Sequence, residues 1–580
     1  MSGAYVFGWS SPSYGEVPVS WQTWDDGFGH VPTIDGDPNW GKLNLDLSAP
    51  GEEGRSQVYD LGSSHARTFT LTENRYGTGG ESATLQIRGD TSPFNQDDFS
   101  PIWANYSGPV SQTWRYVQIR ETTISEAYYY VDYTNGNDSY DGLSPTHSGS
   151  TGPWKTVAKV NAVQASLHPG DQVLFKRGET WAEALLISQP GKALAPIVYG
   201  CYGSGSLPFF DGTSLSSHVV KVTTSYIVLQ YLEIANNLHG YGINLSYGPP
   251  CDHVTVQYCK VHDNYFASIQ DNGSYDIIQY NTCYHSAVDY HINGGDYDGC
   301  IVIGDTSVAY LGMHSTVRYN TIYKTYGEGI LMQYTNYTNV YGNRIWDTLA
   351  PSIYPDSCSY LNIYKNFIYH TGDTNFWSAG GGTMPGIGLF ICDENLIAGH
   401  PVGHDQNWYN NIVVNCYIGF AFSNHGDSPG AALINDLIAN NTFVCPDNSW
   451  SCNVFHVGAA SGGSSHSSTL IYNNVVWAHY GNCGDIVGGL TGLTLSNNEW
   501  YGTNDSSLTG SNVLYTDPLL IAPTQTIALD QIATPLDPAG YKLGVGSPAI
   551  DSALVNATVI DDYWGTPRGA SPDRGAHEYT

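Results

Sequence analysis

IQYNTC at residues 278–283 decides the fold of this chain, because its pattern recurs along the sequence: an Asn stands just before β-branched or aromatic residues. The same pattern occurs in VRYNTI at 317–322, VYGNRI at 340–345, IYKNFI at 363–368, YNNIVV at 409–414 and IYNNVV at 471–476. The recurring positions are Asn281, Asn320, Asn343, Asn366, Asn411, Asn441, Asn474 and Asn498. Intervals of 22, 23 and 24 residues (Cys259 to Asn281, Asn343 to Asn366, Asn474 to Asn498) indicate one coil of a β-solenoid.

A solenoid places residues one period apart next to each other, since its coils stack at the parallel-strand spacing of roughly 4.8 Å. An inward Asn at the same turn of every coil can hydrogen-bond the coils above and below it, which satisfies buried backbone groups at a sharp corner. The alternative, a Greek-key sandwich with chance Asn-hydrophobic pairs, would not keep a 23-residue register. The sequence therefore predicts an all-β solenoid.

The composition and net charge of the chain limit the classes of molecule that it can bind. The 580 residues carry a formal net charge of −32, although only 13% of them are charged. Such a field repels phosphate backbones and anionic lipid, so nucleic acid and membrane surfaces are excluded as partners. A polyanionic glycan is disfavoured unless calcium or a local basic cluster intervenes. No run of about twenty apolar residues can span a bilayer.

The first residues of the chain and its cysteines indicate the compartment of the protein and the oxidation state of its thiols. The opening MSGAYVFGWSSPSYG has no basic segment followed by an apolar core, so we expect a virion protein or a mature extracellular form. Most of the 11 Cys fall near the repeated apolar positions and are interpreted as small buried residues. Cys445 and Cys452, which bracket CPDNSWSC, are the best disulfide candidates.

Residues 1–125 form a different region, without the period and with alternating strands such as RTFTLTENRY and WRYVQIRE. SQVYDLGSSHARTFTL together with WRYVQIRE resembles discoidin-type galactose-binding-like jelly rolls, which implies a β-sandwich for glycan binding or attachment. In that reading the flat rings of Trp21, Trp24, Trp40 and Trp103 stack on sugars; the alternative is that they fill the sandwich core.

Residues 126–515 are predicted to form the solenoid, and residues 516–580 its C-terminal cap. TVAKVNAVQA (156–165) has a helical period that stops at Pro169-Gly170, so it predicts a short capping helix, and PGDQVLFKRG (169–178) the first long strand. The order YYVD, GND, DGLSP, PWKT, PGD, FKRG, with GSPAID and DYWGTPRGASPDRGAHEY near the end, resembles right-handed parallel β-helix proteins of the pectate-lyase-like superfold. That superfold hosts polysaccharide lyases, glycoside hydrolases, esterases and phage tailspikes, so the resemblance implies a glycan partner.

The loop DYTNGNDSYDG has acidic and amide residues at spacings superficially like a calcium loop: Asp132, Asn135, Asn137 and Asp141. In this position of the superfold such a loop is more often a metal-free turn. We therefore name no firm cofactor, and calcium here remains the minor alternative.

Three intervals between ladder positions are too long for one coil: 39 residues after Asn281, 45 after Asn366 and 33 after Asn441. The extra residues must leave as loops, and such loops commonly wall a groove, here along coils 281–411. Four residues past the ladder positions stands a polar row, which we interpret as a self-satisfied turn stack rather than a catalytic row: Asp263, His285, Lys324, Asp347, His370 and Asn415.

The candidate catalytic residues are carboxylates. Asp289 and Glu328 both stand eight residues past a ladder position, which predicts adjacent coils and carboxyl groups roughly 5 Å apart, as in a retaining glycosidase. Like charges that close raise one pKa, as a general acid needs. Asp356 and Glu394 would instead widen the separation and suit an inverting enzyme. The alternative for all four is that they cap turns.

The candidate substrate-binding residues are aromatic or basic: Trp346, Trp377, Tyr326, Tyr354, His291, Arg344 and Lys324. Lys324 and Arg344 would also serve a lyase on a uronic-acid glycan, which needs a cation and a base; few other cations lie on the central coils. Glycoside hydrolysis of a neutral polysaccharide is the leading hypothesis, lyase the second. The third is a non-catalytic adhesin or tailspike, which would form a homotrimer if it comes from a virion.

Overall fold

The computed structural model describes residues 127–580 apart from 247–250, 295–297, 306–311, 379–383, 395–400, 424–429, 447–451, 462–463 and 504–505. Before residue 127 it describes only the backbone of ten strands. The chain divides into two compact units, one of residues 1–129, 165–173 and 189–198, the other of residues 130–164, 174–188 and 199–580. The side chains of Trp21, Trp24, Trp40 and Trp103 lie outside the described residues.

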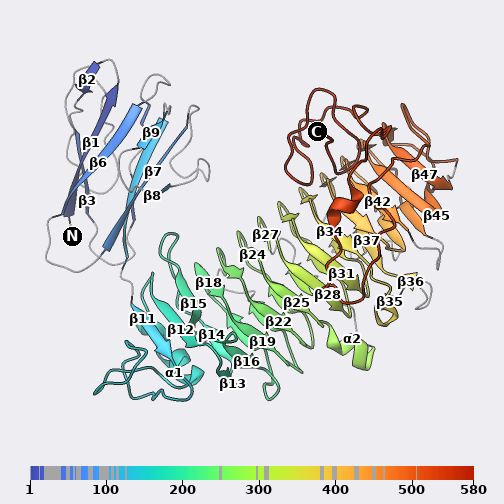
Figure 1. Ribbon diagram of the computed structural model, residues 1–580. Helices are drawn as coiled ribbons and strands as arrows, with labels where there is room; N and C mark the ends of the chain where they lie inside the picture. The colour runs from blue at the N-terminus through green and yellow to red at the C-terminus, as the bar shows by residue number, and fades with distance from the viewer. Residues whose placement is uncertain are drawn as a thin grey trace. The chain divides into compact units, whose positions relative to one another are not determined.

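The N-terminal strands form two antiparallel sheets, as expected for a β-sandwich (Figure 1). The first contains β1 (Ser2–Ser11), β2 (Tyr14–Val17), β3 (Gly41–Asp46), β6 (Arg67–Arg75) and β9 (Val110–Gln112). The second contains β4 (Glu53–Arg55), β5 (Tyr59–Asp60), β7 (Ser82–Asp90), β8 (Ala104–Asn105) and β10 (Tyr116–Ile124). Glycan binding by this region stays a prediction.

The rest of the chain is a right-handed parallel β-helix, which confirms the predicted fold (Figure 1). One parallel sheet has 13 strands, namely β11 (Tyr128–Val131), β12 (Gln172–Lys176), β15 (Ile197–Tyr202), β18 (Ile227–Gln230), β21 (Thr255–Gln257), β24 (Ile277–Gln279), β27 (Thr316–Arg318), β30 (Asn339–Tyr341), β33 (Asn362–Tyr364), β38 (Asn407–Tyr409), β41 (Leu437–Ala439), β44 (Thr469–Tyr472) and β46 (Leu493–Ser496).

The other parallel sheet has 22 strands, and a central coil such as residues 316–333 contributes β27 to the first sheet and β28 and β29 to the second. Its strands are β13 (Thr180–Trp181), β14 (Leu185–Ile187), β16 (Phe209–Asp211), β17 (Val220–Val222), β19 (Glu233–Ala235), β20 (Ile243–Leu245), β22 (Lys260–His262), β23 (Ile269–Asp271), β25 (Thr282–Tyr284), β26 (Ile301–Gly304), β28 (Thr321–Thr325), β29 (Ile330–Gln333), β31 (Arg344–Thr348), β32 (Ile353–Asp356), β34 (Phe367–Tyr369), β37 (Ile387–Cys392), β39 (Ile412–Val414), β40 (Ile418–Ser423), β42 (Thr442–Cys445), β43 (Asn453–Val457), β45 (Val475–Ile486) and β47 (Glu499–Thr503).

Short elements complete the fold. The predicted capping helix is α1 (Val157–Ala162), whose N-cap Thr156 accepts a hydrogen bond from the Lys159 N–H and which buries Val157 and Val160. The others are α2 (Val288–Asn293), the paired strands β35 (Trp377–Ser378) and β36 (Met384–Pro385), and the 3₁₀ turns η1 (Gln164–Ser166), η2 (Thr374–Phe376) and η3 (Pro538–Tyr541). Among the described residues no helix has the length and hydropathy of a bilayer span.

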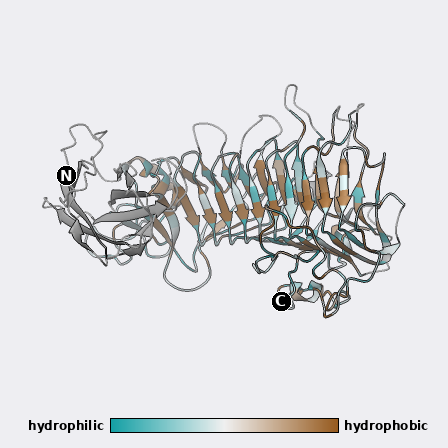
Figure 2. Cartoon of the chain, turned by 90° about the horizontal axis from the view of Figure 1, so that it is seen from above, coloured by the Kyte–Doolittle hydropathy of each residue, from teal (hydrophilic) through white to brown (hydrophobic). Residues whose placement is uncertain are grey.

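Successive coils stay in register because the same side-chain types recur one period apart. Val317 of β27 pairs with Ile278 of β24 before it and with Val340 of β30 after it. Hydrophobic segments therefore fall at corresponding places in successive strands (Figure 2), and their inward side chains form one continuous buried core.

The Asn ladder is confirmed. Asn343 donates its backbone N–H to Asn366 Oδ1 at 3.1 Å, and its Nδ2 donates to the same oxygen at 3.0 Å and to the Val317 carbonyl at 2.9 Å. The same three bonds recur from Asn281 to Asn474, and Asn498 closes the row. Each side chain thus satisfies backbone groups of two neighbouring coils.

Asn343→Ala is expected to destabilise the protein by about 2–3 kcal/mol, because it leaves a buried carbonyl and a buried N–H without partners. The measurement is denaturation in urea. Asn339→Ala is the matched control on the same coil: Asn339 is only partly buried and makes one side-chain bond, from Asn362 Nδ2 at 3.0 Å. Equal losses in the two variants would contradict a special role for the buried row.

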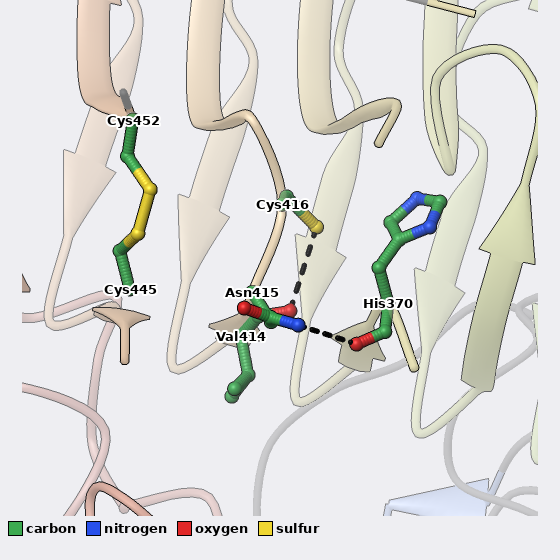
Figure 3. The surroundings of a disulfide bond; sticks show 6 residues. All are labelled: His370, Val414, Asn415, Cys416, Cys445 and Cys452. Atoms are coloured by element: carbon green, nitrogen blue, oxygen red, sulfur yellow. Dashed lines mark hydrogen bonds between the residues drawn. A yellow bond between two sulfur atoms is a disulfide. The ribbon is translucent and has the colours of Figure 1, made fainter. Parts of the chain in front are cut away.

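The polar row past the ladder is confirmed as a turn stack. Asp263, His285, Lys324, Asp347 and Asn415 all adopt positive φ, between 47° and 60°. Their side chains largely satisfy one another or nearby turns: Asp263 bonds His285 at 3.1 Å, and Asp347 accepts two bonds from Thr371 at 2.8 Å. Asn415 donates to the carbonyl of His370 on the neighbouring coil (Figure 3). These five residues thus hold turns, as predicted, whereas the ring nitrogens of the sixth, His370, are buried without a hydrogen-bond partner among the described residues.

The cysteine predictions are also confirmed. Cys445, the last residue of β42, forms a disulfide with Cys452 (Figure 3). The other nine cysteines are free, and all of them except Cys201 are buried. They fill small core positions, as the repeat suggested.

Candidate functional site

A groove of about 790 Å³ crosses the outer face of β23, β26, β29 and β32. It lies on the coils where the long intervals predicted a groove, and it extends to the coil before them. Its lining residues are Tyr241, Phe266, Gln270, Asp289, Asp298, Val302, Gly304, Asp305, Glu328, Leu331, Gln333, Tyr354, Asp356 and Glu394.

The floor of the groove is a row of apolar side chains from successive coils. Val302, Leu331 and Tyr354 occupy equivalent positions, since Val302 pairs with Leu331 and Leu331 with Tyr354. The row continues to Phe390, whose ring stacks on Tyr354 at 5.2 Å, and to Ala421. Apolar surface with an aromatic ring suits the apolar faces of sugar rings.

Carboxylates stand at both ends of these strands. Asp298 and Glu328 precede β26 and β29, whereas Asp305 follows β26, Asp356 ends β32 and Glu394 follows β37. Asp289, on α2, is the sixth carboxylate of the lining. The apolar floor is therefore bordered by acids along both edges, and none of the described residues that line it is basic.

Glu328 lies between Gly327 and Gly329 because the coils approach closely there. A Cβ at Gly327 would overlap the backbone oxygen of Asp298, and one at Gly329 would overlap that of Ser352. The Glu328 side chain is buried, 5% exposed, and its Oε2 has no hydrogen-bond partner within the described part of the chain. Burial raises the pKa of Glu328 to about 8, and the charges of Asp298 and Glu394 add to the rise.

Asp298 and Asp305 are the groove carboxylates that the sequence analysis missed, and Asp298 is the one next to Glu328. Ile301 pairs with Ile330, so Gly299 is level with Glu328 and Asp298 stands beside it on the preceding coil. Burial raises the pKa of Asp298 to about 7, although the backbone N–H of Ala267 hydrogen-bonds its carboxyl group. Aligning CIVIG (300–304) with GILMQ (329–333), instead of counting forward from the Asn ladder, would have predicted the position of Asp298.

The predicted register of Asp289 with Glu328 is wrong. Asp289 lies on α2, where its N–H bonds the Tyr265 carbonyl, and α2 occupies the extra residues between β25 and β26. The corresponding β28–β29 connection has no such insertion, so counting eight residues from each ladder position reaches different points of the two coils. Asp289 still lines the groove.

Asp356, Tyr354 and Glu394 form a connected group at the far edge. The Tyr354 hydroxyl donates to Glu394 Oε2 at 2.6 Å, and the Glu394 N–H donates to Asp356 Oδ1 at 2.8 Å. The structure therefore brings these three predicted residues together with Glu328 and Asp289 in one groove.

Two predicted substrate-binding residues lie elsewhere. Trp346 is 2% exposed and is packed between Tyr323 and Tyr369, at 4.6 and 5.7 Å, in a core shared with the C-terminal segment. Arg344 donates to the Tyr369 hydroxyl at 2.9 Å and to the Leu536 carbonyl at 3.0 Å. Both anchor residues of the C-terminal segment, so their predicted role in the groove is wrong.

The remaining predicted residues are outside the groove lining. Lys324 forms an ion pair with Asp373 at 3.1 Å, and His291 stacks on Tyr326 at 4.0 Å. Trp377 lies on β35, opposite Pro385 of β36. Their part in substrate binding stays a prediction.

The residues named for calcium hold turns. Asp132 accepts bonds from Lys176 Nζ at 2.7 Å and from the Asn135 N–H at 2.8 Å, and Asp141 accepts one from the Leu143 N–H at 3.0 Å. No cluster of three or more His, Cys, Asp or Glu side chains suited to a metal occurs among the described residues. Calcium binding by this loop stays a prediction.

Comparison with known proteins gives the following. No protein-family model matches the chain. A lacto-N-biosidase of Bifidobacterium longum subsp. longum is 37% identical over 84 residues, which are 14% of this chain and 5% of that protein. The chain thus matches only a small part of that curated relative's length.

Among solved structures, the pectate lyase Pel9A has a TM-score of 0.43 at 17% identity over 79% of this chain and 97% of that one. The GH136 lacto-N-biosidase from Eubacterium ramulus has a TM-score of 0.37 at 14% identity, covering 67% and 65% of the two chains. The PL6 family alginate lyase AlyGC has a TM-score of 0.43 at 14% identity, covering 62% and 52%. Likeness at this level does not identify a reaction.

Proposed function

We propose that the protein is a glycoside hydrolase for a neutral polysaccharide, with Glu328 as the general acid and Glu394 as the second carboxylate. The observation that carries the proposal is the pair itself: a buried Glu328 with its pKa raised to about 8 faces a groove whose opposite edge holds Glu394, bonded by the Tyr354 hydroxyl. A carboxylic acid that holds its proton at neutral pH, together with a second carboxylate, is what glycoside hydrolysis requires.

Each carboxylate has a defined step. Glu328, protonated at neutral pH, gives its proton to the glycosidic oxygen as the bond to the anomeric carbon breaks. Glu394, held in place by the Tyr354 hydroxyl, removes a proton from a water that attacks the anomeric carbon from the other side. The two acids border the strands at opposite ends, so we propose an inverting pair with a water between them in place of the retaining pair first predicted from Asp289.

The chemistry of the lining favours an uncharged substrate. Of the lining residues that the structure describes, six are carboxylates and none is basic, and the chain carries a net charge of −32. A uronate would be repelled, and a lyase would need a cation to neutralise it. Leu331 and Tyr354 supply a floor for pyranose rings. Lyase action on a uronic-acid glycan therefore ranks second.

Two further observations agree with the proposal. The 84-residue match is to a protein named as a lacto-N-biosidase, which fits hydrolysis of a glycan. The Cys445–Cys452 disulfide fits an oxidising compartment, as expected at an extracellular or virion surface.

Product analysis of a glycan panel tests the reaction. We expect new reducing ends without the ultraviolet absorbance of an unsaturated uronide, and a first product of inverted anomeric configuration by NMR. Retained configuration would overturn the role of Glu394 as a base toward water. Unsaturated products would overturn hydrolysis, and binding without any product would make the protein an adhesin.

A further inference from the structure

A second binding feature lies on the other parallel sheet. Rings from six successive coils stack in one column beside the 13-stranded sheet, with centroids 4.7–5.1 Å apart and planes within 23° of parallel: Tyr226, His253, Tyr275, His314, Tyr337 and Tyr360. All six adopt positive φ, at the turn that leads into the strand. Within the column each ring covers the faces of its neighbours.

The column of rings ends at Tyr360. The Tyr360 N–H bonds the His404 carbonyl, and the next three coils place Asp405, Asn435 and Ser468 at the same turn, again with positive φ. No ring of the described chain therefore stacks on the second face of Tyr360. His404 meets Tyr360 edge to face, at 85°, and lies outside the lining of the adjoining groove.

A ladder of amides ends at the same coil. Asn407 Nδ2 donates to Asn362 Oδ1 at 3.0 Å, and Asn362 Nδ2 donates to Asn339 Oδ1 at 3.0 Å. The next residue of the row is Leu437, which pairs with Asn407 but has no amide to donate. The Asn407 carboxamide oxygen is thus left as an acceptor at the point where the rings also stop.

A groove of about 490 Å³ occupies the place where both rows stop. Tyr360, Asp405, Asn407 and Asn435 line one part of it, and Tyr472 and Asn556 line another, with Asn556 Nδ2 donating to the Tyr472 hydroxyl. The lining contains carboxylates and amides but no Lys or Arg. It therefore disfavours anions, and its polar character disfavours an apolar peptide.

We propose that this groove is a second glycan-binding site, which holds a neutral sugar unit against the ring of Tyr360, the last of the column, while the Asn407 carboxamide oxygen accepts a bond from one of its hydroxyls. The Asp405 carboxylate already bonds His404 and Asn435. An aromatic face with a planar amide acceptor is a combination that recognises a pyranose. The site lies on a different sheet from the acidic groove and does not depend on the hydrolytic mechanism.

The test is calorimetric titration of the full chain in the Glu328→Gln background, with neutral oligosaccharides of glucose, galactose, mannose, xylose and N-acetylhexosamines. For the oligosaccharide that binds, we expect Tyr360→Ala to weaken one class of site at least tenfold. Tyr275→Ala is the matched control: Tyr275 and Tyr360 are both 40% exposed, but rings cover both faces of Tyr275. Its affinity should stay within about twofold of the parent.

Three results would overturn this site: no oligosaccharide of the panel binds, Tyr360→Ala binds like its parent, or Tyr275→Ala loses as much affinity as Tyr360→Ala. The hydrolytic proposal fails separately. If the wild type releases no reducing ends but binding still depends on Tyr360, the hydrolytic proposal is wrong and the second binding site is supported.

Discussion

Glu328→Gln is expected to lower kcat about 10³-fold while KM changes little, because Gln cannot supply the proton that the leaving oxygen needs. The side chain keeps its size, and Glu328 is uncharged at neutral pH because burial raises its pKa to about 8. The variant should therefore fold normally and retain substrate. The wild-type kcat should fall as the pH rises above about 8, where the acid loses its proton.

Glu499→Gln is the matched control for this loss. Glu499 is also a buried glutamate, its pKa is raised to about 7 by burial, and it lies on β47 and bonds Thr516 at 3.1 Å, outside the groove. Its variant should keep wild-type kcat. Wild-type turnover by Glu328→Gln on the same substrate would remove Glu328 from the mechanism, whatever the products are.

The parts of the fold that could be predicted are those that repeat. The spacing of the Asn residues predicts the stacking of the coils, because each Asn hydrogen-bonds the equivalent Asn of the next coil, from Asn281 to Asn498. A 23-residue period then implies parallel pairing throughout, and α1 follows from its own helical pattern. The groove could be placed because extra residues cannot enter a stacked coil.

The site could be predicted less well because its registers depend on where each insertion leaves the coil. Counting forward from the ladder assumed that the extra residues begin after Asp289. Asp289 itself lies on α2, within the extra residues, so Asp298 and not Asp289 stands beside Glu328. Glu328 needed no such assumption, since its coil carries no insertion. Only apolar runs, which must stay in the core, reveal the register beyond an insertion.

The predicted substrate-binding role of Trp346 and Arg344 was wrong for a different reason. Their positions on the coil are those expected, but the C-terminal segment covers them: Arg344 reaches Leu536, 192 residues away. The repeat pattern cannot predict such a contact. A side chain that the period places on the outside of the coil becomes buried once a distant segment packs on it. Tyr354 and Trp346 are both largely buried, but Tyr354 lines the groove whereas Trp346 packs against the C-terminal segment.

Glu328 is also expected to make the folded protein less stable as the pH rises. Its folded pKa, about 8, lies above the ordinary 4.5, so the folded state holds a proton that the unfolded state releases between these values. Stability is complete below about pH 4.5 and falls by about 1.4 kcal/mol per pH unit up to about 8, a total of about 5 kcal/mol. Glu328→Gln removes this loss.

Urea unfolding of the wild type and Glu328→Gln at about pH 5 and about pH 8 measures the effect, because the difference between the two proteins cancels the other buried acids. We expect similar free energies of unfolding at the lower pH, and a variant more stable than the wild type by about 3–4 kcal/mol at the higher pH. Glu499→Gln should gain less, since its pKa is raised only to about 7. A constant difference across this range would mean that Glu328 is ionised in the folded groove, and the same groove would then lack its proton donor.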